Sequence, residues 1–156
     1  MTLVFEPRKA IYIPTTGGHP KNSEYRVAWG VEQWDHPKNV TKTQMVYKGR
    51  VNGMLSPSFP DDTFDELAVQ FASKLIKQGY GTDSKKSKDV LVLKEVPSVD
   101  DFEYVIDQLE DELQDMNQTI FHKENHALSP VVVSEFRKQF EVKDNIYAFL
   151  FRVEIS

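Results

Sequence analysis

Residues 56–60 read SPSFP, and residues 61–78 continue as DDTFDELAVQFASKLIKQ. Each proline of the first segment fixes its own backbone angle and disfavours helix in the residue before it, so residues 56–60 form a stiff connector. In the second segment apolar residues recur at steps of three or four from Phe64 to Leu75, which predicts an amphipathic helix. The connector therefore ends a first part of the chain that is rich in predicted strands.

The sequence predicts five strands, over residues 9–13, 25–31, 43–51, 90–96 and 145–155. These segments concentrate the β-branched and aromatic side chains that favour extended backbone. Asn52-Gly53 directly follows the third segment and tolerates the positive backbone angles of a two-residue hairpin turn. We therefore expect a tight turn at that pair.

Two further helices are predicted after the helix of residues 61–78. Ser98, with Asp101 three residues later, has the pattern of a helix N-cap and marks the start of the second helix. Ser129-Pro130 combines an N-cap residue with a proline at the first helical position. This pair predicts a third helix over residues 131–140.

Strands grouped early and helices grouped late favour an α+β fold over a doubly wound α/β fold. We expect a single domain over residues 1–156, with a β-rich part at 1–58 and a helix-rich part at 59–156. The first part alone would approach the size at which a single core becomes marginal, which argues against two domains. The expected architecture is a mostly antiparallel or mixed sheet of about five strands, with three helices packed on one face.

The chain has 156 residues, a formal net charge of −5 and no cysteine. The absence of cysteine excludes disulfide frameworks, thiol nucleophiles and thiolate metal sites, and it fits a reducing compartment. The first ten residues show no signal-peptide pattern, and no apolar run approaches the roughly 20 residues of a membrane-spanning helix. We therefore expect a soluble, cytoplasmic protein that has no membrane partner.

The formal charge is +4 over residues 1–58 and −9 over residues 59–156. Eight acidic residues and no basic residue lie between positions 100 and 115, within the predicted second helix. Like charges on one helix repel each other, so this helix is either a binding face for a basic partner or a solvated face. The sign of its charge disfavours direct binding of nucleic acid.

The most distinctive local feature is the sequence HPKN, which occurs at residues 19–22 and again at residues 36–39. Each copy follows a turn or strand end, so the two are either equivalent loops at one edge of the sheet or ordinary turns. Trp34 and Asp35 add an aromatic surface and a hydrogen-bonding group beside the second copy, as in many ligand pockets. The candidate binding residues are His19, Asn22, Trp34, Asp35, His36, Asn39 and Arg50.

Two hypotheses about function follow from these features. The first is a binding or interaction module for a protein or small molecule, with no catalytic step and no cofactor assigned. The alternative is a small metal-dependent or acid-base enzyme that uses four converging histidines, which are His19, His36, His122 and His126. At least three of these side chains must meet in one concave site for the enzyme hypothesis to hold.

Overall fold

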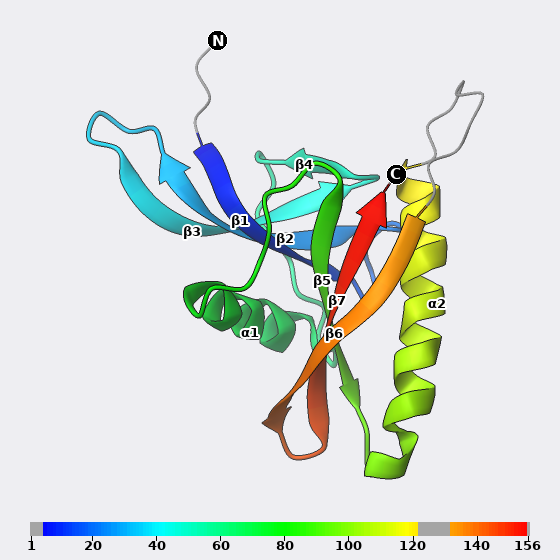
Figure 1. Cartoon of the computed structure of the whole chain (residues 1–156). Coiled ribbons are helices and arrows are strands. Elements are labelled where there is room, and N and C mark those ends of the chain that lie inside the picture. Colours follow the sequence, from blue (N-terminus) through cyan, green and yellow to red (C-terminus); the bar gives the residue numbers. More distant parts are fainter. Residues whose placement is uncertain (1–4, 122–131, 156) are drawn as a thin grey trace, which may run out of the picture.

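The computed structural model describes residues 5–121 and 132–155. Within these ranges one sheet of seven strands has the order β4-β3-β2-β1-β5-β7-β6, and two helices pack against it (Figure 1). The strands are β1 (Phe5–Pro14), β2 (Glu24–Glu32), β3 (Lys38–Tyr47), β4 (Arg50–Asn52), β5 (Ser87–Glu95), β6 (Val132–Lys143) and β7 (Ile146–Ile155). The helices are α1 (Asp65–Lys77) and α2 (Phe102–Phe121), and a 3₁₀ turn at Val99–Asp101 precedes α2.

The sheet consists of two antiparallel blocks that meet at one parallel contact. Strands β1 to β4 form a series of antiparallel pairs, and β5, β7 and β6 form a second series. Between the blocks, β1 pairs with β5 in parallel, through Ile11 with Asp89 and Tyr12 with Val90. Two residue pairs therefore join the blocks into one sheet.

The two helices cover opposite faces of this sheet. Successive side chains on a strand point to opposite faces. On β5, Leu91 and Leu93 belong to the core that packs against α1, whereas Val90 belongs to a second core with Leu109 and Leu113 of α2. The expected sheet of about five strands with three helices on one face is therefore wrong.

The third predicted helix, over residues 131–140, is strand β6. Burial along β6 alternates from Val132, which is buried, to Val133, which is exposed, and this period of two is that of a strand. The β-branched valines favour this conformation, and β7 pairs with β6 from Val132 to Lys143. The Ser129-Pro130 pair that predicted a helix lies outside the described residues.

The third predicted strand, over residues 43–51, is two strands that form a hairpin. Strands β3 and β4 are joined by Lys48 and Gly49, whose φ angles are 52° and 78°. Positive φ at both central residues is the geometry of a type I′ turn, whose twist matches that of the strands. The two-residue turn therefore lies at Lys48-Gly49 rather than at Asn52-Gly53.

The remaining predicted elements are confirmed with small shifts of their ends. The helix predicted over residues 61–78 is α1, and the strands predicted over 9–13, 25–31, 90–96 and 145–155 overlap β1, β2, β5 and β7. Ser98 accepts a hydrogen bond from the backbone N–H of Asp100 at 3.3 Å, as expected of the predicted N-cap. No helix in the described part of the chain is long and apolar enough to cross a membrane.

Gly30 on β2 lies against the backbone of β1, next to a β-bulge between Pro7 and Lys9. A Cβ atom at Gly30 would lie 2.1 Å from the backbone oxygen of Glu6. Gly30→Ala should therefore lower the free energy of unfolding by about 1–3 kcal/mol, the usual cost of overpacking, as measured by urea denaturation.

Gly17→Ala is the matched control, because a Cβ at Gly17 meets nothing within 4 Å. It should change the free energy of unfolding by no more than about 0.5 kcal/mol. Equal stabilities of the two variants would contradict the close approach of β1 and β2.

Candidate functional site

The two HPKN loops lie at opposite ends of β2. The loop of residues 15–23 enters β2, and the loop of residues 33–37 leaves it. The nine residues of β2 span roughly 30 Å, so His19 and His36 do not share a site. The interpretation of the two copies as equivalent loops at one edge of the sheet does not hold.

His19 belongs to a hydrogen-bonded network at the first residue of α1, Asp65. The carboxylate of Asp65 is buried and accepts hydrogen bonds from the Tyr25 hydroxyl at 2.7 Å and from the backbone N–H of Thr16 at 3.2 Å. The Tyr25 hydroxyl also lies 3.0 Å from the backbone oxygen of Ser58, and the Nε2 atom of His19 lies 2.7 Å from the same oxygen. The network therefore ties the β1–β2 loop and the proline connector to the helix.

Tyr25 keeps its proton in this network. Burial, and next the hydrogen bond to Asp65, raise the pKa of Tyr25 far above the usual value of a tyrosine. The phenol therefore donates to Asp65 at all physiological pH values. His19 is half-buried and stacks edge-on against the Tyr25 ring, with 5.6 Å between the ring centroids. These contacts give His19 an anchoring role.

Three candidate residues lie at the exposed tip of the β2–β3 hairpin. Trp34 is 57% exposed, and Asp35 and His36 beside it are also exposed. Asn39, at the start of β3, is exposed close to this tip. This tip is an accessible surface with an aromatic side chain, but no described cavity is lined by it.

The other candidate residues lie elsewhere. Arg50 is exposed on β4, and Asn22 has a φ of 63°, a left-handed conformation that asparagine tolerates in turns. His122 and His126 lie outside the described residues. Within residues 5–121 and 132–155, no group of three or more histidine, aspartate or glutamate side chains is arranged to hold a metal ion.

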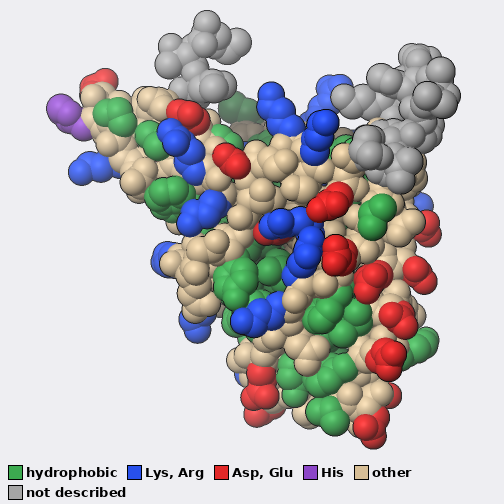
Figure 2. Space-filling model, viewed as in Figure 1, with side chains coloured by type: hydrophobic (Ala, Val, Ile, Leu, Met, Phe, Trp, Pro, Cys, Tyr) green, Lys and Arg blue, Asp and Glu red, His purple; other side chains and the backbone are tan. Residues whose placement is uncertain are grey.

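The acidic residues of α2 lie away from the sheet. Leu109 and Leu113 pack against the sheet, and acidic side chains gather along the outer side of the helix (Figure 2). Glu110 is the acidic residue of α2 that is half-buried. Burial, and next the charges of Asp107 and Asp111, raise the pKa of Glu110 above its ordinary value.

A groove of about 330 Å³ lies on the sheet face that α1 covers. It is lined by residues 79–81, which follow α1, and by Asp89, Arg137, Lys138 and Arg152 from three strands. Figure 2 shows basic and acidic side chains close together in the middle of this face. Three cations and one carboxylate therefore converge on the groove.

A β-bulge places two of these cations next to each other. The register of β6 against β7 shifts between Phe136 and Lys138, so Arg137 is an extra residue in β6. In a regular strand Arg137 and Lys138 would point to opposite faces. Because of the bulge, both side chains line the same groove.

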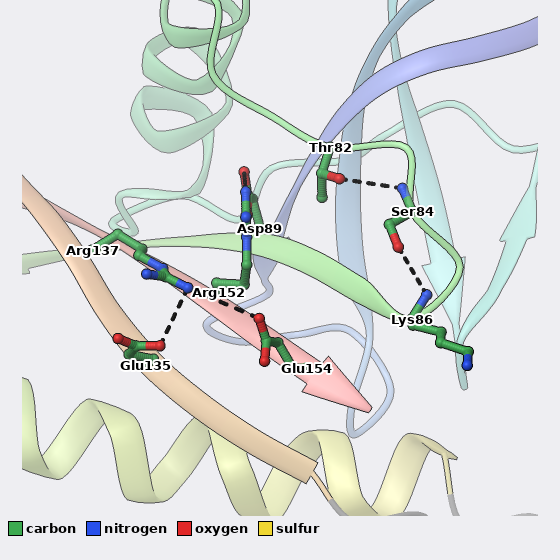
Figure 3. Close-up of polar contacts among 8 residues, drawn as sticks. All are labelled: Thr82, Ser84, Lys86, Asp89, Glu135, Arg137, Arg152 and Glu154. Atoms are coloured by element: carbon green, nitrogen blue, oxygen red, sulfur yellow. Dashed lines mark hydrogen bonds and ion pairs between the residues drawn. The ribbon is translucent and has the colours of Figure 1, made fainter. Parts of the chain in front are cut away.

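The charged side chains alternate in sign across β5, β7 and β6 (Figure 3). The guanidinium of Arg152 donates to both carboxylate oxygens of Asp89, at 2.9 and 3.4 Å. The Nη2 atom of Arg137 lies 3.2 Å from a carboxylate oxygen of Glu135 and 4.0 Å from one of Glu154. The hydrogen bond to Asp89 raises the pKa of Arg152, so this side chain stays charged.

Lys138 extends the basic surface to the other wall of the groove. Its Nζ atom donates to the Tyr80 hydroxyl at 3.2 Å and lies 5.2 Å from the centre of the Phe140 ring. The side chain is exposed, and so is that of Arg137. Both cations can therefore meet a partner without prior unfolding of the chain.

Comparison with protein-family models, with curated protein sequences and with solved structures finds no match for this chain.

Asp65→Ala should destabilise the protein by about 2–3 kcal/mol, because it removes buried hydrogen bonds to a charged group at a helix N-terminus. The measurement is the urea midpoint at constant m-value. The matched control is Asp61→Ala, at an exposed position before α1, which should change stability by no more than about 0.5 kcal/mol. A small effect of Asp65→Ala would show that the network does not anchor the loop.

Glu110→Gln should stabilise the protein at pH 7 by a few tenths of a kcal/mol, about the size of like-charge repulsion on a helix. The raised pKa means that the folded state favours the protonated form, so ionisation of Glu110 costs stability as the pH rises. The gain should therefore disappear as the pH falls below the ordinary range of glutamate. Melting temperatures of both proteins from pH 3 to pH 8 test this, and a gain that is constant with pH would contradict it.

Proposed function

We propose that this protein is a binding module whose groove on the α1 face holds an acidic segment of a partner protein. The observation that supports this most directly is the β-bulge in β6, which turns the neighbouring Arg137 and Lys138 toward one groove. Bulges recur where a strand must re-aim a side chain next to a functional site. Arg152 adds a third cation to the same groove.

The mixed signs of the cluster favour a protein segment over a polyanion. Asp89, Glu135 and Glu154 lie within contact distance of the two arginines and would repel the phosphates of a nucleic acid. A peptide that carries one or two carboxylates among neutral or basic residues matches such an alternating surface.

Binding of an acidic segment would break the ion pair between Arg137 and Glu135, and the cost in free energy is small. Arg137 and Glu135 are both exposed, and an exposed ion pair contributes only about 0.2–1 kcal/mol to stability. A carboxylate from a partner can therefore replace Glu135 on the guanidinium at little cost. The bidentate Asp89–Arg152 pair is less exposed and holds the floor of the groove in place.

The hairpin tip around Trp34 is a second proposed contact surface of the same module, because the aromatic side chain of Trp34 is exposed there. The cytoplasmic location expected from the cysteine-free sequence remains a prediction.

The test is selection of peptides from a random displayed library on the wild-type protein, followed by affinity measurement with purified peptides. Selected peptides should be enriched in aspartate or glutamate. The Arg137→Gln/Lys138→Gln variant should bind them at least about tenfold more weakly, as expected for lost charge-assisted hydrogen bonds. Raising the salt concentration should weaken binding by wild type as well.

Lys94→Gln is the matched control, since Lys94 is an exposed cation on β5 that does not line the groove. It should bind the peptides with wild-type affinity. The free energy of unfolding of both variants should lie within about 0.5 kcal/mol of the wild-type value, because exposed charges contribute little to stability. Peptides without acidic residues, or equal affinity for wild type and the double variant, would overturn the proposal.

A further inference from the structure

A second cavity, of about 270 Å³, lies on the opposite face of the sheet from the groove. It is bordered by Tyr12 on β1, Glu24 on β2, Lys88 on β5, and the end of α2 at Ile120 and Phe121. The β3–β4 turn packs close to it, since a Cβ atom at Gly49 would lie 2.9 Å from the Cγ2 atom of Ile120. The groove on the α1 face and this cavity share no lining residue.

A buried ion pair lies at this cavity. The side chains of Lys88 and Glu24 are 8% and 0% exposed, and the Nζ atom of Lys88 lies 3.1 and 2.9 Å from the two carboxylate oxygens of Glu24. Removing two charges from water costs several kcal/mol per ion, so such a pair is weak as a stabilising device. Both residues line the cavity, so a ligand bound there would meet this pair.

Lys88 retains capacity to bind a further group. An ammonium has three N–H donors, and among the described residues Glu24 is its one hydrogen-bond partner. The rings of Tyr12 and Phe121 lie 4.8 and 5.5 Å from Nζ, as in cation–π contacts. These rings hold the ammonium at the cavity, where a ligand oxygen would make a stronger contact than a ring does.

The rest of the lining defines the class of ligand. Lys85 adds a second cation, so the lining carries two positive charges against the one of Glu24. Ile120 and Ile155 supply apolar surface from α2 and β7. The cavity is slightly smaller than the usual range of ligand pockets, about 300–1,000 Å³, which limits the ligand to a small molecule.

We propose that this cavity binds a small carboxylic acid with an apolar or aromatic tail. The carboxylate lies between Lys88 and Lys85, and the tail packs against Ile120, Phe121 and Ile155. This site is separate from the groove on the α1 face, and each of the two proposals can be contradicted without the other.

The test uses 3-phenylpropanoate as the probe and its neutral amide, 3-phenylpropanamide, as the matched control ligand. Backbone NMR resonances of wild type are followed during titration with each compound. The carboxylate should give saturable shifts that centre on Tyr12, Lys88 and Ile120, and the amide should bind at least about tenfold more weakly, because it lacks the charge. No saturation by 3-phenylpropanoate, or equal binding of the amide, would overturn the proposal.

Two variants locate the site. Glu24→Leu/Lys88→Met removes both charges together, which avoids an unpaired buried ion, and it should lose at least about tenfold in affinity for 3-phenylpropanoate. Lys85→Gln should weaken binding in the same direction without disturbing the buried pair, and it carries the test if the double variant does not fold. Lys86→Gln, at an exposed neighbour outside the lining, should bind as wild type does.

Unchanged affinity of the Lys85→Gln variant, or of a folded double variant, would overturn the proposal. The Arg137→Gln/Lys138→Gln protein should bind 3-phenylpropanoate with wild-type affinity, so a failure of the peptide proposal is distinguishable from a failure of this one. A loss of affinity in that protein would place the probe in the groove and contradict the second site.

Discussion

The parallel contact between β1 and β5 is the constraint on which the rest of the structure depends. It consists of two residue pairs, Ile11 with Asp89 and Tyr12 with Val90, whereas every other strand pairing in the described sheet is antiparallel. Three further sets of contacts cross this junction. The backbones of Ala10 and Thr82 exchange hydrogen bonds, α1 packs against β1, β2 and β5, and Lys88 reaches across β1 to Glu24 on β2. Without this junction, each antiparallel block would have a second exposed edge, β1 or β5, in addition to its outer strand.

The groove and the cavity both lie at this junction, on its two faces. Asp89 lines the groove on the α1 face, and Lys88, its neighbour in sequence, lines the cavity on the α2 face. Alternation along β5 is enough to send these consecutive charged residues to opposite sides. Each residue pairs with an opposite charge from a different strand, Asp89 with Arg152 on β7 and Lys88 with Glu24 on β2. The Lys88–Glu24 pair crosses the junction and the Asp89–Arg152 pair lies within the second block, and each pair positions polar groups of one site.

Local pattern in the sequence predicts most single elements but not the way they combine. Helix α1 is visible because apolar residues from Phe64 to Leu75 keep a helical period, and the strands at Ile11 and Phe149 are visible from their β-branched and aromatic residues. Strand β6 is not, because pairing with β7 outweighs the N-cap signal that precedes it. Neither the placement of the helices on opposite faces nor the β1–β5 contact between residues far apart in sequence is recorded by a local pattern.

The candidate sites likewise depend on how the elements combine, which local sequence pattern does not predict. The motif that stands out most in the sequence, HPKN, occurs in two loops that β2 holds apart. The groove instead collects residues 79–81, 89, 137–138 and 152, whose proximity is set by strand order. Arg137 and Lys138 carry a local signal, two adjacent cations in a strand, but it has meaning only once the bulge in β6 is known. Lys88 is one of several lysines in a polar segment, and its burial depends on Glu24, which lies in another block of the sheet.

Native-state hydrogen exchange tests the junction most directly. The amide groups of Val27 on β2 and Phe149 on β7 lie in the buried centres of the two blocks. If the β1–β5 contact joins the blocks into one cooperative unit, both amides should exchange with the same free energy of opening, equal to that of global unfolding, and with the same dependence on denaturant. Exchange of Val27 at a lower free energy than Phe149, or the reverse, would show that the blocks open independently and would contradict this account.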